Sequence, residues 1–323
     1  MTFVKSALEN GGVLKPLIIP SELTNGTGLC NPSVFTENGN ILINLRHIQY
    51  TLYHSELCNY EHQYGPLVYL NPENDITLTT TNYICELNNE LEITHYTKVD
   101  TSELDQPPLW EFVGLEDARL VKWDNKVYLT GVRRDTTTNG QGRMELSELE
   151  FTDTEVKEVS RFRIPAPGKD NSYCEKNWMP ILDQPYHYVK WTNPTEVVKV
   201  DPEEKTCTTV HLGEWEEMSK DLRGGSQIMP YKDGYLTLNH ETDLYKSEAG
   251  RKDATYRHRF TYWDKEWNVI KFSKVFSFMN AKIEFVCGMA EFKGDYLITF
   301  GFQDNAAYVL KVTDKFLEDF INE

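Results

Sequence analysis

Short runs of alternating apolar and polar residues, broken by Asn, Asp and Gly, dominate the chain. Helical periodicity is confined to Asp314–Asn322, with Gly213–Lys220 as a weaker candidate. Alternating runs that flank a turn of Asn, Asp or Gly are typical of β-hairpins. Five such hairpins are predicted: Ser33–Thr36 with Asn40–Arg46, Leu120–Trp123 with Lys126–Val132, Met179–Leu182 with Tyr186–Trp191, Gln227–Tyr231 with Tyr235–His240, and Val286–Phe292 with Tyr296–Gln303.

The spacing of these hairpins predicts a repeated architecture. Their turns lie roughly 50 to 85 residues apart, which leaves space for two further strands in each interval. Thr80–Leu87 with Glu90–Lys98, and Arg257–Trp263 with Trp267–Phe276, fit such additional strands. Four strands repeated five times favour an all-β fold, a five-bladed β-propeller with an axial pocket, as a single domain over residues 1–323.

Polar residues end the returning strand of each hairpin. These ends are Arg46, Arg133-Arg134, Lys190-Trp191, His240-Glu241 and Gln303-Asp304. If the returning strands are the inner strands of five blades, their ends meet at one mouth of the axial channel. The alternative is that the strands end in polar residues because they reach solvent there.

Composition narrows the classes of function. The 323 residues carry a formal net charge of −17, which argues against general binding to nucleic acid or to an anionic membrane. The six cysteines lie far apart without a CxxC pair, as expected of reduced thiols in a cytoplasmic protein. No signal-peptide core and no membrane-spanning apolar run is present. We therefore expect a soluble cytoplasmic protein without membrane insertion.

The stretch Gly114–Asp135 concentrates ionisable groups at the ends of one hairpin. Glu116, Asp117 and Arg119 precede its first strand, and Arg133, Arg134 and Asp135 follow its second. Carboxylates beside cations at one edge of a hairpin can perform acid and base chemistry. A surface hairpin with solvated charges is the alternative interpretation.

Four segments in order resemble glycoside hydrolase family 130, the β-mannoside phosphorylases, and the related β-1,2-mannosyltransferases. GLEDARL (Gly114–Leu120) is similar to the family's G-x-E-D-P-R-[IV] motif. The other segments are EKNWMPILDQPYHYVKW (Glu175–Trp191), LRGGSQIMPYKDGYLTLNHET (Leu222–Thr242) and Ile283–Val312 with its terminal acidic motif. The resemblance covers most of the chain and implies a five-bladed propeller.

The resemblance implies an inverting enzyme that makes or cleaves a β-glycosidic, most often β-mannosidic, bond. Asp117 matches the family's catalytic acid, which protonates the leaving oxygen, in this family through a sugar hydroxyl. Phosphate is the nucleophile and needs a cationic cradle. Lys176, Lys190 and Arg223 match or lie near the basic positions, with Arg133 and Arg134 close by, and Gly224-Gly225 offers backbone N–H groups.

Other positions match residues that contact sugars in the family. Asp304 matches an acidic residue that holds sugar hydroxyls, and Arg46 and His240 match residues at the mouth of the pocket. The predicted sugar-binding set is Arg46, Glu116, Arg119, His240, Glu284 and Asp304. Trp178 and Trp191 offer flat apolar faces for a sugar ring, although packing in the core is the commoner use of a tryptophan.

Departures from the family pattern keep other reactions open. Ala118 stands where the family has Pro, and Tyr256–Phe260 adds the cations Arg257 and Arg259. The additional cations would suit the diphosphate of a nucleotide sugar, and hence a glycosyltransferase. An inverting hydrolase would instead use Glu284 or Glu241 to activate water. A non-catalytic glycan-binding propeller is the reading from a different class.

The sequence predicts no metal site and no bound cofactor. The eight histidines form no HxH or HxxxH pair with carboxylates at ligand spacing, and no Gly-rich nucleotide motif is present. The expected small molecules are a sugar or oligosaccharide with inorganic phosphate, a sugar-1-phosphate or a nucleotide sugar. The sequence leaves the oligomeric state undetermined.

Overall fold

A computed structural model describes residues 1–323 apart from 54–67, 71, 169–171, 216–221 and 247–251. Its regular structure consists mainly of β-strands, which confirms the predicted all-β class. In the described part of the chain the helices are α1 (Phe3–Glu9), α2 (Ser21–Thr24) and α3 (Asp314–Asn322). None of these is long and apolar enough to cross a membrane.

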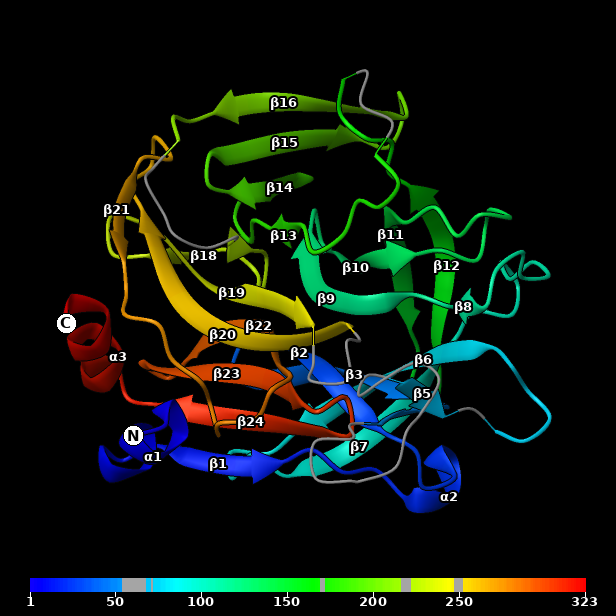
Figure 1. The fold of residues 1–323 in the computed structure, drawn as a ribbon, viewed down its shortest axis with the longest axis horizontal. Helices are drawn as coiled ribbons and strands as arrows, with labels where there is room; N and C mark the ends of the chain where they lie inside the picture. Colours follow the sequence, from blue (N-terminus) through cyan, green and yellow to red (C-terminus); the bar gives the residue numbers. More distant parts are fainter. Residues whose placement is uncertain (54–67, 71, 169–171, 216–221, 247–251) are drawn as a thin grey trace.

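The strands form several sheets arranged around a common centre (Figure 1). One sheet joins the two ends of the chain, in the order β1 (Val13–Pro16), β24 (Ala306–Val312), β23 (Asp295–Phe302) and β22 (Glu284–Phe292). A second has the order β13 (Met179–Pro180), β14 (His187–Thr192), β15 (Thr195–Asp201) and β16 (Thr206–Leu212). A third contains β17 (Leu222–Arg223), β19 (Gly234–Lys246), β20 (Lys252–Trp263) and β21 (Val269–Phe272), and β18 (Met229–Tyr231) also pairs with β19.

The largest sheet has two antiparallel halves. The first half is β2 (Leu29–Glu37), β3 (Asn40–Ile48), β6 (Leu78–Leu87) and β7 (Ile93–Asp100). The second is β12 (Val156–Arg163), β11 (Arg143–Phe151), β10 (Lys126–Arg133) and β9 (Glu116–Trp123). Within the described residues, strand pairing joins the halves at one short junction, where β7 and β12 pair in parallel at Val156 with Val99 and Lys157 with Asp100. β8 (Phe112–Val113) pairs with β6, and β4 (Thr51–Tyr53) pairs with β5 (Val68–Leu70).

All five predicted hairpins are present. They are β2–β3, β9–β10, β13–β14, β18–β19 and β22–β23. The additional strands predicted between them correspond to β6–β7 and β20–β21. The predicted C-terminal helix matches α3, whereas Gly213–Lys220 lies partly outside the described residues, and 213–215 are not helical.

One detail of the predicted arrangement is wrong. The strands that enter the hairpins, and not the returning strands, are innermost: β2, β9, β13 and β22 each stand at an end of the strand order. They gather near the middle of the molecule in Figure 1, where β2 contacts both β22 and β9. The returning strands are second from the centre.

The side chain of Gln227 connects three of the innermost strands, β2, β9 and β22, at the centre. Its side chain is fully buried, and its Nε2 donates to the carbonyl oxygens of Val34 and Leu120, each at 2.9 Å. The Met289 N–H donates to Oε1 of Gln227 at 3.2 Å. One amide therefore satisfies backbone groups of β2, β9 and β22 that no sheet ladder pairs at these positions.

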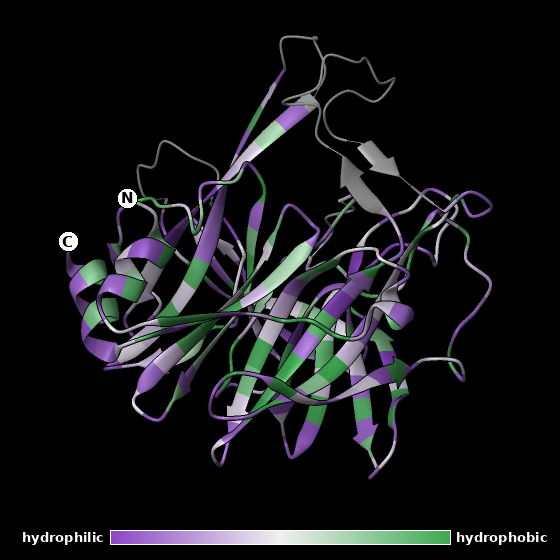
Figure 2. Ribbon diagram, turned by 90° about the horizontal axis from the view of Figure 1, so that it is seen from below, coloured by the Kyte–Doolittle hydropathy of each residue, from purple (hydrophilic) through white to green (hydrophobic). Residues whose placement is uncertain are grey.

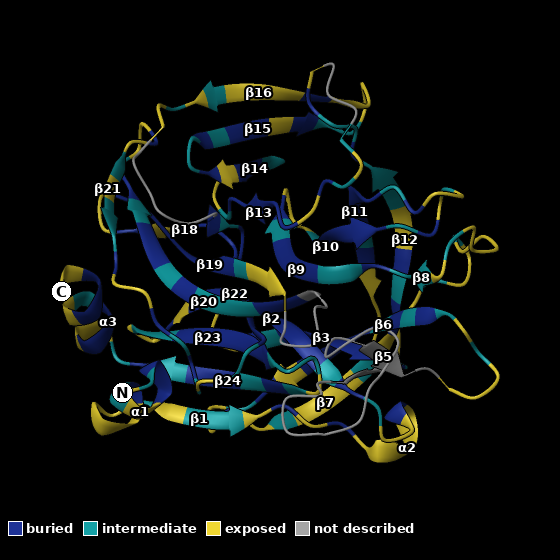
Figure 3. Cartoon of the chain, viewed as in Figure 1, coloured by how far each residue is buried: buried dark blue, intermediate teal, exposed yellow. Residues whose placement is uncertain are grey.

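Apolar clusters fill the spaces between neighbouring groups of strands. Figure 2 shows apolar and polar bands alternating along the strands, and Figure 3 shows burial falling from the central strands to outer ones such as β1 and β16. Representative pairs in the five main clusters are Phe260 with Phe300, Leu45 with Val309, Ile84 with Leu120, Trp123 with Tyr188, and Val189 with Trp263. Burying each such side chain contributes about 1.5–3 kcal/mol.

The two terminal helices cover one of these clusters. Phe3 of α1 stacks on Phe276 with ring centroids 4.4 Å apart and meets Phe320 of α3 edge to face at 4.8 Å. Thr313 caps α3 by accepting from the Phe316 N–H. Five cysteines, Cys30, Cys85, Cys174, Cys207 and Cys287, are free thiols, as expected, and Cys58 lies outside the described residues.

Candidate active site

A cavity of about 130 Å³ opens beside the central strands. It collects residues from β2, β3, β8, β9, β17, β19, β20 and β22, and from the segments that follow β3, β12 and β23 and precede β22. Its lining is Asn31, Arg46, Tyr50, Phe112, Glu116, Asp117, Lys176, Asn177, Arg223, His240, Tyr256, Ile283, Phe285 and Asp304. Seven predicted site residues are therefore brought together here: Arg46, Glu116, Asp117, Lys176, Arg223, His240 and Asp304.

Four lining residues hold backbone conformations that L-residues rarely adopt. Asn31, Asp117, Asn177 and Asp304 have φ of 43°, 49°, 61° and 50°. Asn and Asp tolerate the left-handed region better than other non-glycine residues. Such backbone conformations cost free energy, and in proteins they cluster at functional sites.

Asp117 is held in place by two donors on one oxygen. Arg46 Nη1 and Asn31 Nδ2 each lie 2.7 Å from Asp117 Oδ1. Burial raises the pKa of this carboxyl, but Arg46, Asn31 and more distant cations lower the pKa by more, so the net shift is downward. Asp117 is therefore an ionised carboxylate with its other oxygen, Oδ2, outside these two bonds.

Arg46 organises this side of the cavity. Besides Asp117, its guanidinium reaches Glu116 Oε2 at 3.3 Å and Tyr50 Oη at 3.1 Å. Its Nε and Nη2 also donate to Thr80 Oγ1 at 3.1 and 2.9 Å. A buried guanidinium with this many acceptors has one orientation, so it fixes where Asp117 points.

The two other carboxyls in the cavity have raised pKa values. Burial, together with the neighbouring Asp117 and Glu116 carboxylates, raises the pKa of Asp304 to about 6 against the attraction of Arg46. Burial also raises the pKa of Glu116, despite Arg46. The cavity thus holds one strongly acidic carboxyl and two that take a proton more readily, which is the separation that acid and base chemistry uses.

Lys176 and Arg223 supply positive charge to the same cavity. Lys176 is exposed, and within the described residues no carboxylate forms an ion pair with it. Its charge lowers the pKa of Asp117, Glu116 and Asp304, which places it near all three. Two cations beside a small polar cavity form a site suited to an anion.

His240 contributes a neutral imidazole. Burial, and then the charge of Arg223, lower its pKa to about 3. Its ring stacks on Tyr256 with centroids 5.2 Å apart and meets Phe285 edge to face at 4.9 Å. These three rings form one wall of the cavity, and apolar ring faces suit the C–H face of a sugar.

Buried polar atoms without partners converge on the cavity. Among the described residues, Asn31 Oδ1, Glu116 Oε1, Asn177 Oδ1 and His240 Nδ1 are buried and accept or donate no hydrogen bond. Leaving such a group unpaired costs about 1–3 kcal/mol, so their grouping in one cavity indicates a ligand that would satisfy them.

Arg119 and Glu284 lie outside the cavity, where they support the backbone. Arg119 donates from Nε and Nη2 to the Gly225 carbonyl at 2.9 and 2.7 Å, and from Nη1 to the Asp117 carbonyl at 2.5 Å. Glu284 accepts from the N–H groups of Phe278, Met279 and Ala281 at 2.7 to 2.9 Å. Arg119 therefore acts on Asp117 through its main chain.

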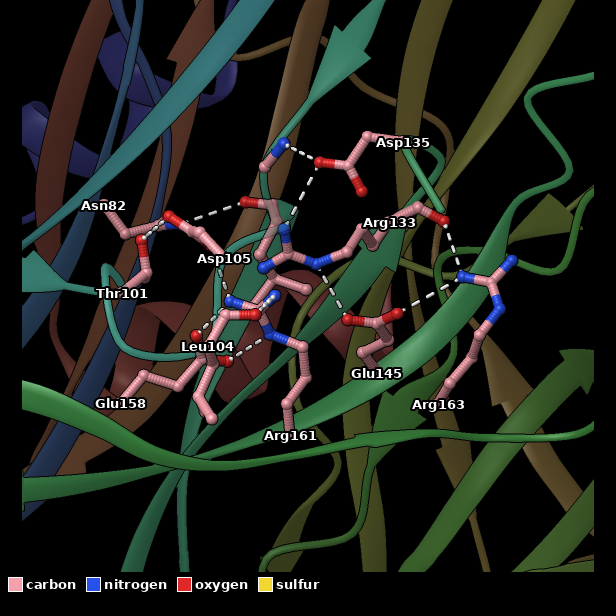
Figure 4. Close-up of polar contacts among 12 residues, drawn as sticks. Asn82, Thr101, Leu104, Asp105, Arg133, Asp135, Glu145, Glu158, Arg161 and Arg163 are labelled. Carbon is pink, nitrogen blue, oxygen red and sulfur yellow. Dashed lines mark hydrogen bonds and ion pairs between the residues drawn. The ribbon is translucent and has the colours of Figure 1, made fainter. Parts of the chain in front are cut away.

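Three of the predicted anion contacts do not line the cavity. Lys190 lies between Glu175 and Glu196, 3.6 Å from each. Arg134 places its guanidinium over the rings of Phe112 and Tyr173. Arg133 pairs with Asp135 and Glu145 beside a separate, larger cavity (Figure 4).

The residues that suggested a nucleotide-sugar transferase, a hydrolase or a stacking platform for sugar make other contacts in the structure. Glu241 binds Arg259 at 2.8 Å, and Arg257 donates to the Tyr256 carbonyl at 2.8 Å. Trp178 is buried in the core and donates to Glu175, while Trp191 is exposed outside the cavity lining. In the described chain no cluster of three or more His, Cys, Asp or Glu could hold a metal ion.

The glycine pair near Arg223 serves close packing. A Cβ on Gly224 would lie 1.8 Å from the Asn177 carbonyl oxygen, and one on Gly225 would lie 2.1 Å from the Leu238 carbonyl oxygen. The chain needs glycine here because two backbones approach each other directly. This role differs from the anion contact that the sequence suggested.

Sequence reasoning missed Asn31, Asn177, Tyr256 and Phe285 as lining residues. Asn31 carried one usable signal, since it precedes Pro32 in the middle of a strand run, and Asn177 follows Lys176 directly. Nothing in the local pattern distinguishes Tyr256 or Phe285 from core aromatics.

No protein-family model and no curated protein matches the sequence. Solved structures do match the fold. A β-1,2-mannobiose phosphorylase from Listeria innocua, bound to β-1,2-mannobiose, is 14% identical with a TM-score of 0.54, covering 95% of this chain and 96% of its own. A mannose phosphorylase from Leishmania mexicana, bound to phosphate, is 13% identical with a TM-score of 0.53, covering 98% and 93%.

A third structure comes from work on family 130 glycoside hydrolases that target β-1,2-mannosidic linkages in Candida mannan. It is 12% identical with a TM-score of 0.55 and covers 90% of this chain and 85% of its own. The resemblance to family 130 that the motifs indicated is thus confirmed in three dimensions. The chain has the fold shared by these mannoside phosphorylases and glycoside hydrolases.

Proposed function

We propose that this protein is an inverting carbohydrate-active enzyme that transfers a β-linked sugar between phosphate and a saccharide. Mannose is the sugar that we propose first. The observation that carries the proposal is the joining of an ionised Asp117 with the cations Lys176 and Arg223 in one small cavity. The solved structures of similar fold include one bound to a mannoside and one bound to phosphate, which supports this substrate class.

In the proposed phosphorolysis, a phosphate oxygen held by Lys176 and Arg223 attacks the anomeric carbon from the face opposite the glycosidic oxygen. The bond from the anomeric carbon to that oxygen breaks, and the oxygen takes a proton that a protonated Asp117 donates, directly or through a sugar hydroxyl. The products are an inverted sugar-1-phosphate and a shortened saccharide. One acid suffices, because phosphate is already a nucleophile and no water needs activation.

In the free protein Asp117 is in the ionised state that a base in the synthetic direction needs. As a carboxylate it can accept the proton of an acceptor hydroxyl, directly or through a sugar hydroxyl, while the sugar-1-phosphate loses phosphate. Bound phosphate would neutralise Lys176 and Arg223 and place negative charge near Asp117. Both changes raise its pKa, which prepares it to donate a proton in phosphorolysis.

We also propose that residues 1–323 form a single five-bladed propeller. Dividing the large sheet at the short β7–β12 junction gives five groups of strands, and one apolar cluster lies between each neighbouring pair. The pairing of β1 with β24 would close the ring by joining the two ends of the chain.

A nucleotide sugar has less support, because Arg257 and Arg259 are engaged away from the cavity. Inverting hydrolysis is the second candidate, and one observation favours it. Glu116 Oε1 is buried, faces no partner and belongs to a lining residue, so it could hold a water. Glu284 and Glu241 are less suited to that role, since their oxygens are bound elsewhere.

The test is a screen of donors with purified protein and mixed sugar acceptors. Mannose-1-phosphate, other sugar-1-phosphates and nucleotide sugars would be supplied, with release of phosphate or nucleotide followed over time. The proposal expects phosphate release from a sugar-1-phosphate that is lost in Asp117→Asn. Saccharide binding that survives in both proteins, without turnover of any donor, would indicate a glycan-binding protein instead.

A further inference from the structure

A second cavity, of about 620 Å³, lies between the two halves of the largest sheet. The halves pair only at the start of β12, and the rest of that strand, including Glu158 and Arg161, faces the cavity instead of β7. We call it the β7–β12 cavity. Protein interiors rarely keep voids of this size, whereas ligand pockets of 300–1,000 Å³ are usual.

Five of the six charged side chains that line this cavity form ion pairs (Figure 4). The sixth, Lys98, is exposed. Arg133 binds Glu145 at 2.8 Å and Asp135 at 3.3 Å. Arg161 binds Glu158 through two hydrogen bonds and reaches Asp105 at 2.9 Å. Both arginines of the lining are thus matched by adjacent carboxylates, whereas Lys176 of the smaller cavity forms no ion pair with a carboxylate of the described chain. Its ligand should therefore be neutral.

The remaining lining combines hydroxyl groups with apolar faces. Ser147 is 2% exposed, and its hydroxyl forms no hydrogen bond with the described part of the chain, nor do those of Thr81 and Thr136. Leu109 and Leu129 line the cavity as well. A saccharide presents hydroxyl groups at its edges and C–H groups on its faces. The lining matches both, since its free hydroxyls and its paired charged groups can form hydrogen bonds and its leucines offer apolar surface.

The walls of this cavity also hold the segment that carries Asp117. Thr80 lines the cavity and accepts from Arg46, and the Gly114 N–H donates to Asp135 Oδ2 at 2.8 Å. Asn82 donates to the Leu115 carbonyl at 3.0 Å. A ligand that contacts these walls would restrict the Gly114–Asp117 segment.

We propose that the β7–β12 cavity is a second, non-catalytic site for a neutral saccharide, and that its occupation steadies the segment bearing Asp117. The site goes beyond the proposed reaction, because its lining includes none of the groups that would contact phosphate or the anomeric carbon. Saccharide bound here would act on the reaction through Arg46 and the Gly114–Asp117 backbone.

Equilibrium dialysis with labelled mannose, β-1,2-mannobiose, cellobiose and lactose tests the site. All proteins would carry Asp117→Asn, so that no saccharide is consumed. Thr136→Trp places a bulky group at an exposed lining position, and Thr138→Trp is the matched control, since Thr138 is exposed in the same loop but does not line the cavity. The expected result is loss of one bound saccharide per chain in Thr136→Trp and none in the control.

Lys176→Trp separates this outcome from the proposed function, because Lys176 is exposed and lines only the smaller cavity. If the smaller cavity binds no sugar, Lys176→Trp leaves the count unchanged while Thr136→Trp still removes one saccharide. Saccharide should also slow amide hydrogen exchange over residues 112–118 in Lys176→Trp. Binding of every saccharide unchanged by Thr136→Trp would overturn the inference.

Discussion

Arg46 and Asp117 form a short ion pair, with Arg46 Nη1 2.7 Å from Asp117 Oδ1, at the inner ends of two different strands. The side chains are 5% and 16% exposed, so solvent screens the pair only weakly. The pair keeps Asp117 ionised and pointed into the cavity, and several predictions depend on it.

Arg46→Gln should raise the pKa of Asp117, because its largest favourable partner is removed while burial remains. Activity should fall by about 100-fold or more, since Asp117 also loses its fixed orientation. Removing one partner of a buried pair should lower the free energy of unfolding by about 3 kcal/mol.

Denaturant unfolding and the pH dependence of kcat/KM measure both effects. Lys122→Gln is the matched control, because Lys122 of β9 forms an ion pair with Glu37 of β2 at the surface. Loss of this surface pair should lower the free energy of unfolding by less than about 1 kcal/mol. Equal effects of the two substitutions would contradict the role given to Arg46.

Asp304→Asn should stabilise the folded protein at neutral pH. The folded pKa of about 6 exceeds the ordinary value of 3.8, so the folded state binds the proton more tightly. Stability attributable to this carboxyl is therefore present below pH 3.8 and is lost as the pH rises through 6. The uncharged side chain of Asp304→Asn has no such pH-dependent loss of stability.

The expected gain at pH 7.5 is about 1–2 kcal/mol, and it should vanish near pH 4. Unfolding curves at the two pH values measure it. A destabilisation at pH 7.5 would show that the Asp304 carboxylate is compensated in a way this account omits.

His240 and His258 should remain neutral between pH 5 and 8. Burial lowers the pKa of His240 to about 3 and that of His258 well below its ordinary value. Nuclear magnetic resonance of the ring signals, assigned by His240→Gln and His258→Gln, would follow them. A titration midpoint between pH 6 and 7 in either ring would be inconsistent with its burial.

Gly225→Ala should destabilise the fold severely, by about 3 kcal/mol or more, because its Cβ would lie 2.1 Å from a backbone oxygen. Gly213→Ala is the control, since its nearest neighbours would be at 3.5 Å, and it should change stability by less than about 0.5 kcal/mol. Thermal unfolding distinguishes the two. A stable, active Gly225→Ala protein would contradict the close approach of the two backbones.

The hairpins could be predicted because each combines alternating apolar residues with a turn of Asn, Asp or Gly, both of which are local features. The order of the strands around the centre could not, because it depends on contacts between distant segments such as Gln227 with Val34 and Leu120. Helix α1 could not be predicted from local pattern, because it is stabilised by packing of Phe3 into an aromatic cluster that is distant in sequence.

The polar residues that end the five returning strands were predicted to meet at one pocket, and this is correct for three of the strands and wrong for two. Arg46, His240 and Asp304 line it, whereas Arg133 and Lys190 do not. Arg133 is held by ion pairs with Glu145 and Asp135. For Lys190 the reason lies in the backbone: the pairing of β14 with β15 shifts register between Val189 and Trp191, so Lys190 is an extra residue in β14. A one-residue shift turns the following side chains to the other face of a strand, and sequence alternation alone does not reveal it.

The dependence of cleavage on phosphate tests the central claim most directly. Purified protein would be incubated with β-1,2-mannobiose, with and without inorganic phosphate, beside Asp117→Asn, and the products followed by phosphorus and proton nuclear magnetic resonance. The account predicts a sugar-1-phosphate of inverted configuration that forms only with phosphate and is absent in the variant. Release of free mannose without phosphate would contradict it and assign hydrolysis instead.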